Sequence, residues 1–149
     1  MTDYRQEFED LMVVVTKEGA SDLHLTVGRH PTLRVSGDLV PIVKKPLLTA
    51  DDTVGFISQL LTAENKELFW KNKELDFSYQ ATAGVRFRGN AFFQRGVVGA
   101  AFRLIPSKIK TLAELGLPER LTDFARHEQG FFLVVGPVGQ GKSTTLASL

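Results

Sequence analysis

A short apolar run and the glycine-rich turn that follows it constrain the fold of this chain more than any other stretch. Residues 131–135, Phe-Phe-Leu-Val-Val, are uninterrupted in the manner of a strand buried on both faces. They precede Gly136-x-x-x-x-Gly141-Lys142-Ser143, the Walker A pattern, after which helix formers continue to the last residue. A strand, a glycine-rich turn and a helix in this order predict a P-loop.

The glycine-rich turn predicts a site for the phosphates of a nucleotide. Glycines let successive backbone N–H groups point into one concavity, and the positive end of the following helix dipole faces the same anion. Lys142, the predicted catalytic residue, would reach the β- and γ-phosphates, and the Ser143 hydroxyl would ligate Mg²⁺. The predicted nucleotide-binding residues are Gly136, Pro137, Val138, Gly139, Gln140, Gly141, Lys142, Ser143 and Thr144.

Other parts of a P-loop domain are missing from the sequence. Such a domain needs further parallel strands, a second acidic residue for Mg²⁺ and a group that orients the attacking water. The sequence ends seven residues after Lys142, which leaves no room for these parts. We therefore expect a fragment of a longer protein, and we expect that the fragment itself does not hydrolyse ATP.

Composition is that of a globular protein with no general affinity for nucleic acid. The 149 residues are 43% hydrophobic and 23% charged, and their net charge of +1 implies no global attraction to nucleic acid or membrane. The absence of cysteine excludes disulfides and thiolate metal sites. No transmembrane run of about 18 apolar residues and no signal peptide occur, so the cytoplasm is the expected location. The scattered histidines predict no metal site; they are His24, His30 and His127.

Three helices are expected in the first part of the chain. Apolar residues at helical spacing predict a helix over residues 4–17 that stops at Gly19. Thr49 caps a second helix, and a third begins after Thr62. The predicted buried face of the second helix consists of Val54, Ile57, Leu60 and Leu61.

The remaining apolar segments of this part predict an antiparallel sheet of about five strands. Gly37-Asp38 has the chemistry of a two-residue hairpin turn, and Pro41 places the strand after this turn at an edge. The sheet and the helices together form an α+β domain over residues 1–105. The segments with strand-like patterns are 22–27, 32–36, 39–43, 75–80, 85–94 and 98–105.

The last part of the chain has a different pattern. Residues 106–110 contain two lysines and no apolar periodicity, which predicts a linker. Thr111 and Glu114 form a capping box, and residues 121–125 predict a short helix. We expect residues 111–149 to be the beginning of a second, α/β domain.

Three arginines on two neighbouring predicted strands are not needed by the fold. Alternation places Arg86 and Arg88 on one face of the strand 85–94, and Arg103 follows on the next strand. They form either a solvated face, where they pair with nearby acids, or an anion site, because guanidinium groups match phosphate oxygens. A nucleic-acid surface is the third hypothesis, and the net charge argues against it.

Several segments occur in the same order in one known family. They precede the Walker A pattern and cover residues 20–25 (Ala-Ser-Asp-Leu-His-Leu), 34–37, 76–77, 86–96, 102–106 and 112–118. With them the chain resembles the N-terminal part of the type IV pilus retraction (twitching motility, PilT-like) ATPases of the secretion-ATPase superfamily. Gln140 and Val138 depart from the Ser or Thr common in that family, at positions that the Walker A pattern leaves open.

The resemblance implies a PAS-like N-terminal domain, a short linker and a RecA-like ATPase domain, incomplete here. It further implies a hexameric motor that binds ATP and Mg²⁺ and acts on the pilus at its inner-membrane platform. The motor would be cytoplasmic, peripheral to the inner membrane at the pilus base. Arginines of the PAS-like domain reach the triphosphate in this family; by motif position they are Arg88 and Arg103, with Arg86 as a further candidate.

Two other functions remain open. An assembly or type II secretion ATPase of the same superfamily would share these motifs. Retraction is preferred because the sequence enters the PAS-like domain directly at Met1, whereas assembly and secretion ATPases usually carry an additional N-terminal domain. The other alternative is a PAS-like interaction module without enzymatic activity.

Overall fold

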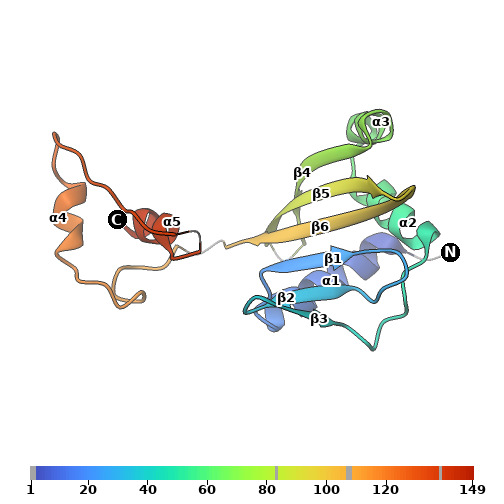
Figure 1. The fold of residues 1–149 in the computed structure, drawn as a ribbon, viewed down its shortest axis with the longest axis horizontal. Helices are drawn as coiled ribbons and strands as arrows, with labels where there is room; N and C mark the ends of the chain where they lie inside the picture. Colours follow the sequence, from blue (N-terminus) through green and yellow to red (C-terminus); the bar gives the residue numbers. More distant parts are fainter. Residues whose placement is uncertain (1–2, 83, 107–108, 138) are drawn as a thin grey trace. The chain divides into compact units, whose positions relative to one another are not determined.

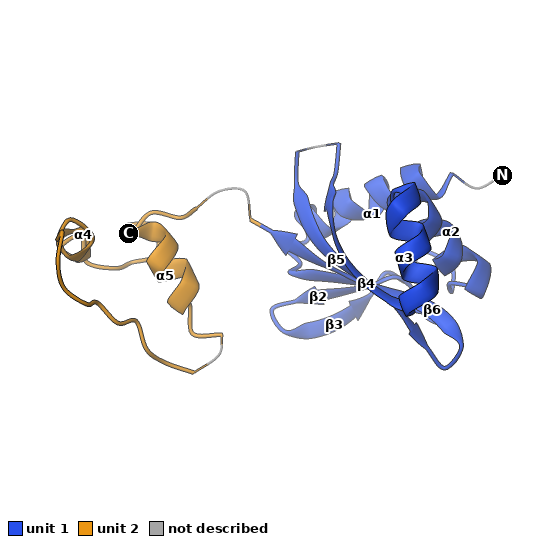
Figure 2. Cartoon of the chain, turned by 90° about the horizontal axis from the view of Figure 1, so that it is seen from above, with its two compact units in different colours: residues 1–105 blue, residues 106–149 orange. Residues whose placement is uncertain are grey.

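The computed structural model describes residues 3–82, 84–106, 109–137 and 139–149. The chain divides into two compact units, Met1–Ile105 and Pro106–Leu149, which are coloured separately in Figure 2. Within the described ranges, no helix has both the length and the apolar character needed to cross a membrane.

The first unit is built on one antiparallel sheet of six strands where about five were expected, and each of the six segments with a strand-like pattern forms one of them. The strand order is β3-β2-β1-β6-β5-β4, so two three-stranded meanders meet where β1 pairs with β6 (Figure 1). The predicted α+β class with an antiparallel sheet is confirmed. The strands are β1 (Asp22–Leu25), β2 (Thr32–Val35), β3 (Asp38–Pro41), β4 (Glu74–Gln80), β5 (Arg86–Gln94) and β6 (Val97–Ile105).

Three capped helices pack on this sheet. They are α1 (Tyr4–Lys17), α2 (Ala50–Leu60) and α3 (Ala63–Asn72). The capping box of α2 is present, with the Asp52 N–H donating to Thr49 Oγ1 at 3.2 Å and the Thr49 N–H donating to Asp52 Oδ2 at 2.8 Å. Helices α1 and α2 cover one face of the sheet, and α3 lies beside β4 (Figure 1).

Two local predictions need correction. The buried residues of α2 are Thr53, Phe56 and Ile57, while Val54 and Leu60 are partly buried, because the helix turns its aromatic residue towards Phe8 of α1. The β2–β3 hairpin turns at Ser36-Gly37, one residue earlier than expected, since Val35 pairs with Asp38. Both turn residues have positive φ, 51° and 97°, as a tight hairpin of this twist requires.

The two sides of β5 and β6 have opposite characters. Phe87, Ala91 and Phe102 are fully buried, and the Phe102 ring lies 4.6 Å from the ring of Phe8. Between these residues, Arg88 and Arg103 point out of the core and are exposed. The predicted alternation along residues 85–94 is therefore confirmed, and it separates an apolar core from a charged face.

The described residues of the second unit form two short helices, α4 (Leu121–Ala125) and α5 (Lys142–Ser148). The predicted helices at these positions are confirmed, but the predicted buried strand over residues 131–135 is wrong. That segment is coil, with Phe131 89% and Val135 80% exposed. A buried strand needs neighbouring strands on both sides, and the described residues of this unit include none.

Candidate functional site

Glycines with positive φ angles shape the loop before α5. Gly139 and Gly141 adopt positive φ angles of 83° and 79°, conformations that suit glycine, and Gly141 is the N-cap residue of α5. A hollow of about 350 Å³ opens there, lined by Gly139, Gly141, Lys142, Ser143 and Thr144. Val138, a predicted nucleotide-binding residue, lies outside the described residues.

Polar groups in this hollow suit a phosphate. Lys142 Nζ donates a hydrogen bond to the carbonyl oxygen of Pro137 at 2.6 Å, so the ammonium group folds back over the loop. The Ser143 side chain is exposed and, within the described part of the chain, makes no hydrogen bond. An ammonium group beside a glycine loop can donate hydrogen bonds to a phosphate, and a free hydroxyl can supply an oxygen ligand to the Mg²⁺ ion bound with it.

A second candidate site lies on the charged face of the sheet in the first unit. Arg88 of β5 is directly opposite Arg103 of β6, a register that the alternation along one strand does not determine. Arg86 pairs with Ile105 further along the same strands and does not line this site. The site is a hollow of about 350 Å³ lined by Asp22, Asp76, Arg88, Asn90, Ala101 and Arg103.

Asp22 of β1 is the buried acid of this site. Its side chain is only 10% exposed, and its Oδ1 accepts a hydrogen bond from Arg103 Nε at 2.9 Å. Its Oδ2 accepts a hydrogen bond from Ser21 Oγ at 2.7 Å and lies 3.7 Å from Arg34 Nε. Burial alone would raise the pKa of Asp22, but the hydrogen bonds from Ser21 and Arg103 and the positive charge of Arg103 outweigh it, so the pKa is lowered.

Asp76 of β4 is the exposed acid of this site. Arg88 Nη2 donates to Asp76 Oδ2 at 3.0 Å, and Asn90 Nδ2 donates to Asp76 Oδ1 at 3.1 Å. These hydrogen bonds, that from Arg88 first, lower the pKa of the Asp76 carboxyl. The side chains of Arg88 and Asp76 are 68% and 57% exposed, so water competes with this ion pair.

Each of the two opposed arginines is thus paired with an acid, as the solvated-face hypothesis predicts. The pairing does not exclude an anion site, because each guanidinium keeps N–H donors that no other described residue uses. Asp22 and Asp76 were missed as site residues. Both belong to segments that carry the family resemblance, but pairing with an arginine on another strand is not visible in a local pattern.

The three histidines have separate surroundings. His24 Nε2 is buried and has no hydrogen-bond partner in the described part of the chain, and burial, followed by the nearby Arg34, lowers the His24 pKa. His30 Nδ1 lies 2.6 Å from the Lys45 carbonyl oxygen, and His127 Nδ1 lies 2.7 Å from that of Asp123. No three His, Cys, Asp or Glu side chains gather into a metal site in the described residues.

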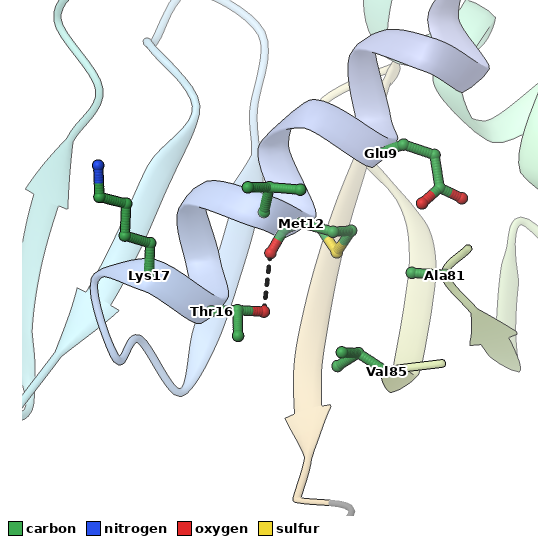
Figure 3. Close-up of a pocket in the computed structure, with 7 residues that line it drawn as sticks. Glu9, Met12, Thr16, Lys17, Ala81 and Val85 are labelled. Atoms are coloured by element: carbon green, nitrogen blue, oxygen red, sulfur yellow. Dashed lines mark hydrogen bonds between the residues drawn. The ribbon is translucent and has the colours of Figure 1, made fainter. Parts of the chain in front are cut away.

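A third hollow, of about 390 Å³, has a different chemistry. It lies between α1 and the loop that joins β4 to β5, and Met12, Ala81 and Val85 face it in Figure 3. Glu9 stands at its rim, where its carboxylate accepts hydrogen bonds from the Tyr79 hydroxyl at 2.6 Å and the Thr82 N–H at 3.0 Å. Its lining is mainly apolar, which does not suit a phosphate.

Comparisons with known proteins agree with the motifs. No family model matches the chain. The type IV pilus retraction ATPase PilT of Pseudomonas aeruginosa is 40% identical over 143 residues, which cover 96% of this chain and 41% of that protein. The type IV pilus ATPase PilU of the same organism is 38% identical over 143 residues, which cover 96% of this chain and 37% of that protein.

A solved structure supports the same relationship. The crystal structure of the pilus retraction motor PilT with bound ADP superposes with a TM-score of 0.81 at 34% identity, over 94% of this chain and 41% of that one. The chain thus spans about two fifths of the length of the relatives it matches. Sequence and fold agree over nearly the whole chain, which is similar to the type IV pilus retraction ATPases and matches the N-terminal part of those proteins.

Proposed function

We propose that this chain is part of an ATP-driven motor that retracts type IV pili in twitching motility. The observation that carries the proposal is the relationship of 96% of the chain to a pilus retraction ATPase, at 40% identity. The glycine loop and the paired arginines supply the chemistry that such a motor needs. The residues of this chain bind and sense ATP, and hydrolysis requires groups from the rest of the motor.

In this proposal the loop over residues 136–144 acts as a P-loop. Its backbone N–H groups hold the phosphates, and Lys142 leaves the Pro137 carbonyl to reach the β- and γ-phosphates. Ser143 would hold Mg²⁺, which neutralises charge on the phosphates when it is bound. This loop and the residues around it belong to a RecA-like domain, while residues 1–105 form a PAS-like domain joined to it by the linker 106–110.

Arg88 and Arg103 sense the triphosphate in the complete motor, with Arg86 as a third candidate. Planar guanidinium groups bind phosphate oxygens through two N–H donors, which suits them to detect the γ-phosphate. Arg88 and Arg103 line the same hollow and lie at directly opposite positions on the neighbouring strands β5 and β6. Arg86, on the same face, makes no hydrogen bond or ion pair to another described residue, so its guanidinium is free to bind an anion.

The motor would work as a hexamer in the cytoplasm, at the inner-membrane platform of the pilus. The resemblance to the pilus retraction ATPases implies this assembly and this location. The near-neutral charge of the chain gives no reason to expect nucleic acid as a partner.

The similar likeness to PilU favours a second candidate, a type IV pilus ATPase with another action on the pilus. The identity to PilU, 38%, is close to the identity to PilT, 40%, over the same number of residues. In this candidate the ATP site is the same and only the action on the pilus differs.

The proposal is tested with the full-length protein in a bacterium that lacks its retraction ATPase. We expect the wild-type protein to restore twitching and to hydrolyse ATP, and Lys142→Ala to abolish both, because the variant loses the charge that contacts the phosphates. ATP hydrolysis without restored twitching would favour the second candidate. Absence of ATP binding by the full-length protein would favour a non-enzymatic interaction module.

A further inference from the structure

The ion pair between Arg103 and Asp22 is asymmetric in exposure. Asp22 is 10% exposed in its side chain, whereas the Arg103 side chain is 72% exposed. The carboxylate is held from several sides, by the Ser21 hydroxyl, by Arg103 and by Arg34 at a longer distance. A buried, multiply held acid therefore anchors an arginine whose end reaches into solvent.

The atom through which Arg103 is held matters. Asp22 accepts a hydrogen bond from Nε, the nitrogen nearest the aliphatic stem, and no other described residue accepts one from Arg103. Both terminal amino groups, which carry four of the five guanidinium N–H donors, remain available. The carboxylate thus limits the rotation of the guanidinium without occupying the donors that bind a phosphate in bidentate fashion.

The two other arginines near this face are held differently. Arg88 uses a terminal nitrogen, Nη2, for an exposed acid, so a phosphate must compete with Asp76 for that group. Arg34 lies beside Asp22 and also donates from Nη1 to the Gly37 carbonyl oxygen at 2.9 Å, which ties down its end. Of these three, only Arg103 combines a buried anchor with a free end.

We infer that Asp22 is the positioning residue of the motor, because it holds Arg103 in the orientation that binds the γ-phosphate of ATP. This inference rests on the proposed function, in which Arg103 senses the triphosphate. Asp22 does not touch ATP. It acts through Arg103, whose guanidinium would otherwise sample many rotamers before it met the phosphate.

The first test is kinetic and uses the full-length protein with MgATP. Asp22→Asn keeps the size of the side chain and removes its charge. We expect turnover to fall about tenfold, the lower end of the range found for residues that orient metal ligands, with the affinity for ADP changed less than about twofold. In an Arg103→Ala background, Asp22→Asn should have no further effect on turnover. Glu7→Gln, which breaks the ion pair between Glu7 of α1 and Lys45, is the matched control and should leave turnover unchanged.

The second test needs no variant that could fail to fold. Nuclear magnetic resonance of the wild-type protein should show the Arg103 Nε–H as a slowly exchanging signal and the Arg86 Nε–H as a rapidly exchanging one, because Arg103 Nε is bonded to a buried carboxylate. Equal exchange at the two arginines would overturn the inference.

The kinetic outcomes separate the inference from the function on which it rests. If Arg103→Ala lowers turnover and Asp22→Asn does not, the positioning role is wrong and the sensing role survives. If Arg103→Ala leaves turnover unchanged, the sensing role itself is wrong and the positioning role falls with it. An equal loss from Asp22→Asn in the presence and absence of Arg103 would show a structural role for Asp22.

Discussion

The two units of the chain contain similar apolar segments, yet only one of them builds a core. In Met1–Ile105 the aromatic residues Phe8, Phe87 and Phe102 are completely buried between the helices and the sheet. In Pro106–Leu149 the apolar run over residues 131–135 is solvent-exposed coil, and Leu112 is the only buried hydrophobic residue among those described. Apolar composition alone therefore does not determine burial.

The difference lies in the partners that each unit supplies. Every strand of the first unit has an antiparallel neighbour, and two helices seal one face of the sheet. The second unit presents one strand-like segment and no described strand to pair with it. A strand gains stability only from its neighbours, so the same kind of sequence is ordered in one unit and exposed in the other.

Hydrogen exchange should show the largest contrast between the units. We expect backbone amides in β1, β5 and β6 to be protected at least about 10³-fold, because they open only when the domain unfolds. Amides of residues 131–135 should exchange close to the rate of an unfolded peptide. Protection of this segment in a sample shown to be monomeric would contradict the contrast.

Removing one phenylalanine from each unit sharpens the comparison. Phe102→Ala should lower the free energy of unfolding by about 3–5 kcal/mol, since it empties a fully buried site. Phe131→Ala, at a residue that is 89% exposed, should change it by less than about 0.5 kcal/mol. Urea unfolding followed by Trp70 fluorescence measures the effect of Phe102→Ala on the first unit, and amide hydrogen exchange measures the effect of Phe131→Ala on the second. Equal effects would show that residues 131–135 are packed in solution.

In the full-length protein, the two units should contribute to different kinetic constants. Arg88→Ala should lower turnover by about 10- to 10³-fold with little loss of ADP affinity, because a guanidinium at the γ-phosphate acts mainly in the transition state. Lys142→Ala should weaken the binding of both ATP and ADP, since the lysine also contacts the β-phosphate. Steady-state kinetics with calorimetric titration separates the two effects. Unchanged turnover in Arg88→Ala would favour a purely solvated face.

The smallest expected effect is a pH dependence of the free energy of unfolding of the first unit. The pKa of Asp22 is lowered in the folded chain, so its ionised form stabilises the fold above the ordinary aspartate pKa of about 3.9. This contribution is lost as the pH falls through the lowered value. At pH 7 the wild type should exceed Asp22→Asn in the free energy of unfolding by on the order of 1 kcal/mol, and the difference should shrink below about pH 4.

Denaturant unfolding of both proteins between pH 2 and 7 provides the measurement. In an Arg103→Gln background the difference should be smaller throughout, because the main cationic partner of Asp22 is gone. A difference that stays constant down to pH 2 would show that Asp22 stabilises the fold by packing alone.

Local patterns predicted most of the first unit. Helical spacing located α1, the capping threonines located α2 and α3, and the alternation along residues 85–94 separated the arginines from the core. Patterns of this kind depend on residues close together in the sequence, which explains their success. The one-residue error at Ser36-Gly37 arose because serine seldom adopts positive φ, so the glycine was assigned to the wrong turn position.

The missed features depend on distant residues. The pairing of β1 with β6 brings Asp22 beside Arg103, 81 positions later, and nothing near either residue indicates the other. The failed strand over residues 131–135 has the same cause, because strand formation is decided by neighbours that a local pattern does not contain. Candidate site residues such as Arg88 were therefore predicted where the pattern of a single strand indicated them. Residues whose role depends on the pairing of two strands, such as Asp22, were missed.

The pairing of β1 with β6 also affects how the protein folds while the ribosome synthesises it. A bacterial or eukaryotic ribosome adds about 5–20 residues per second, so β1 waits roughly 4–16 s for β6 to be synthesised. During that interval Leu23 and Leu25, completely buried in the finished domain, lack the strand that covers one edge of β1. The nascent chain is thus exposed to misfolding until about residue 105 has left the exit tunnel, and this is the period in which a chaperone that binds apolar segments should act on it.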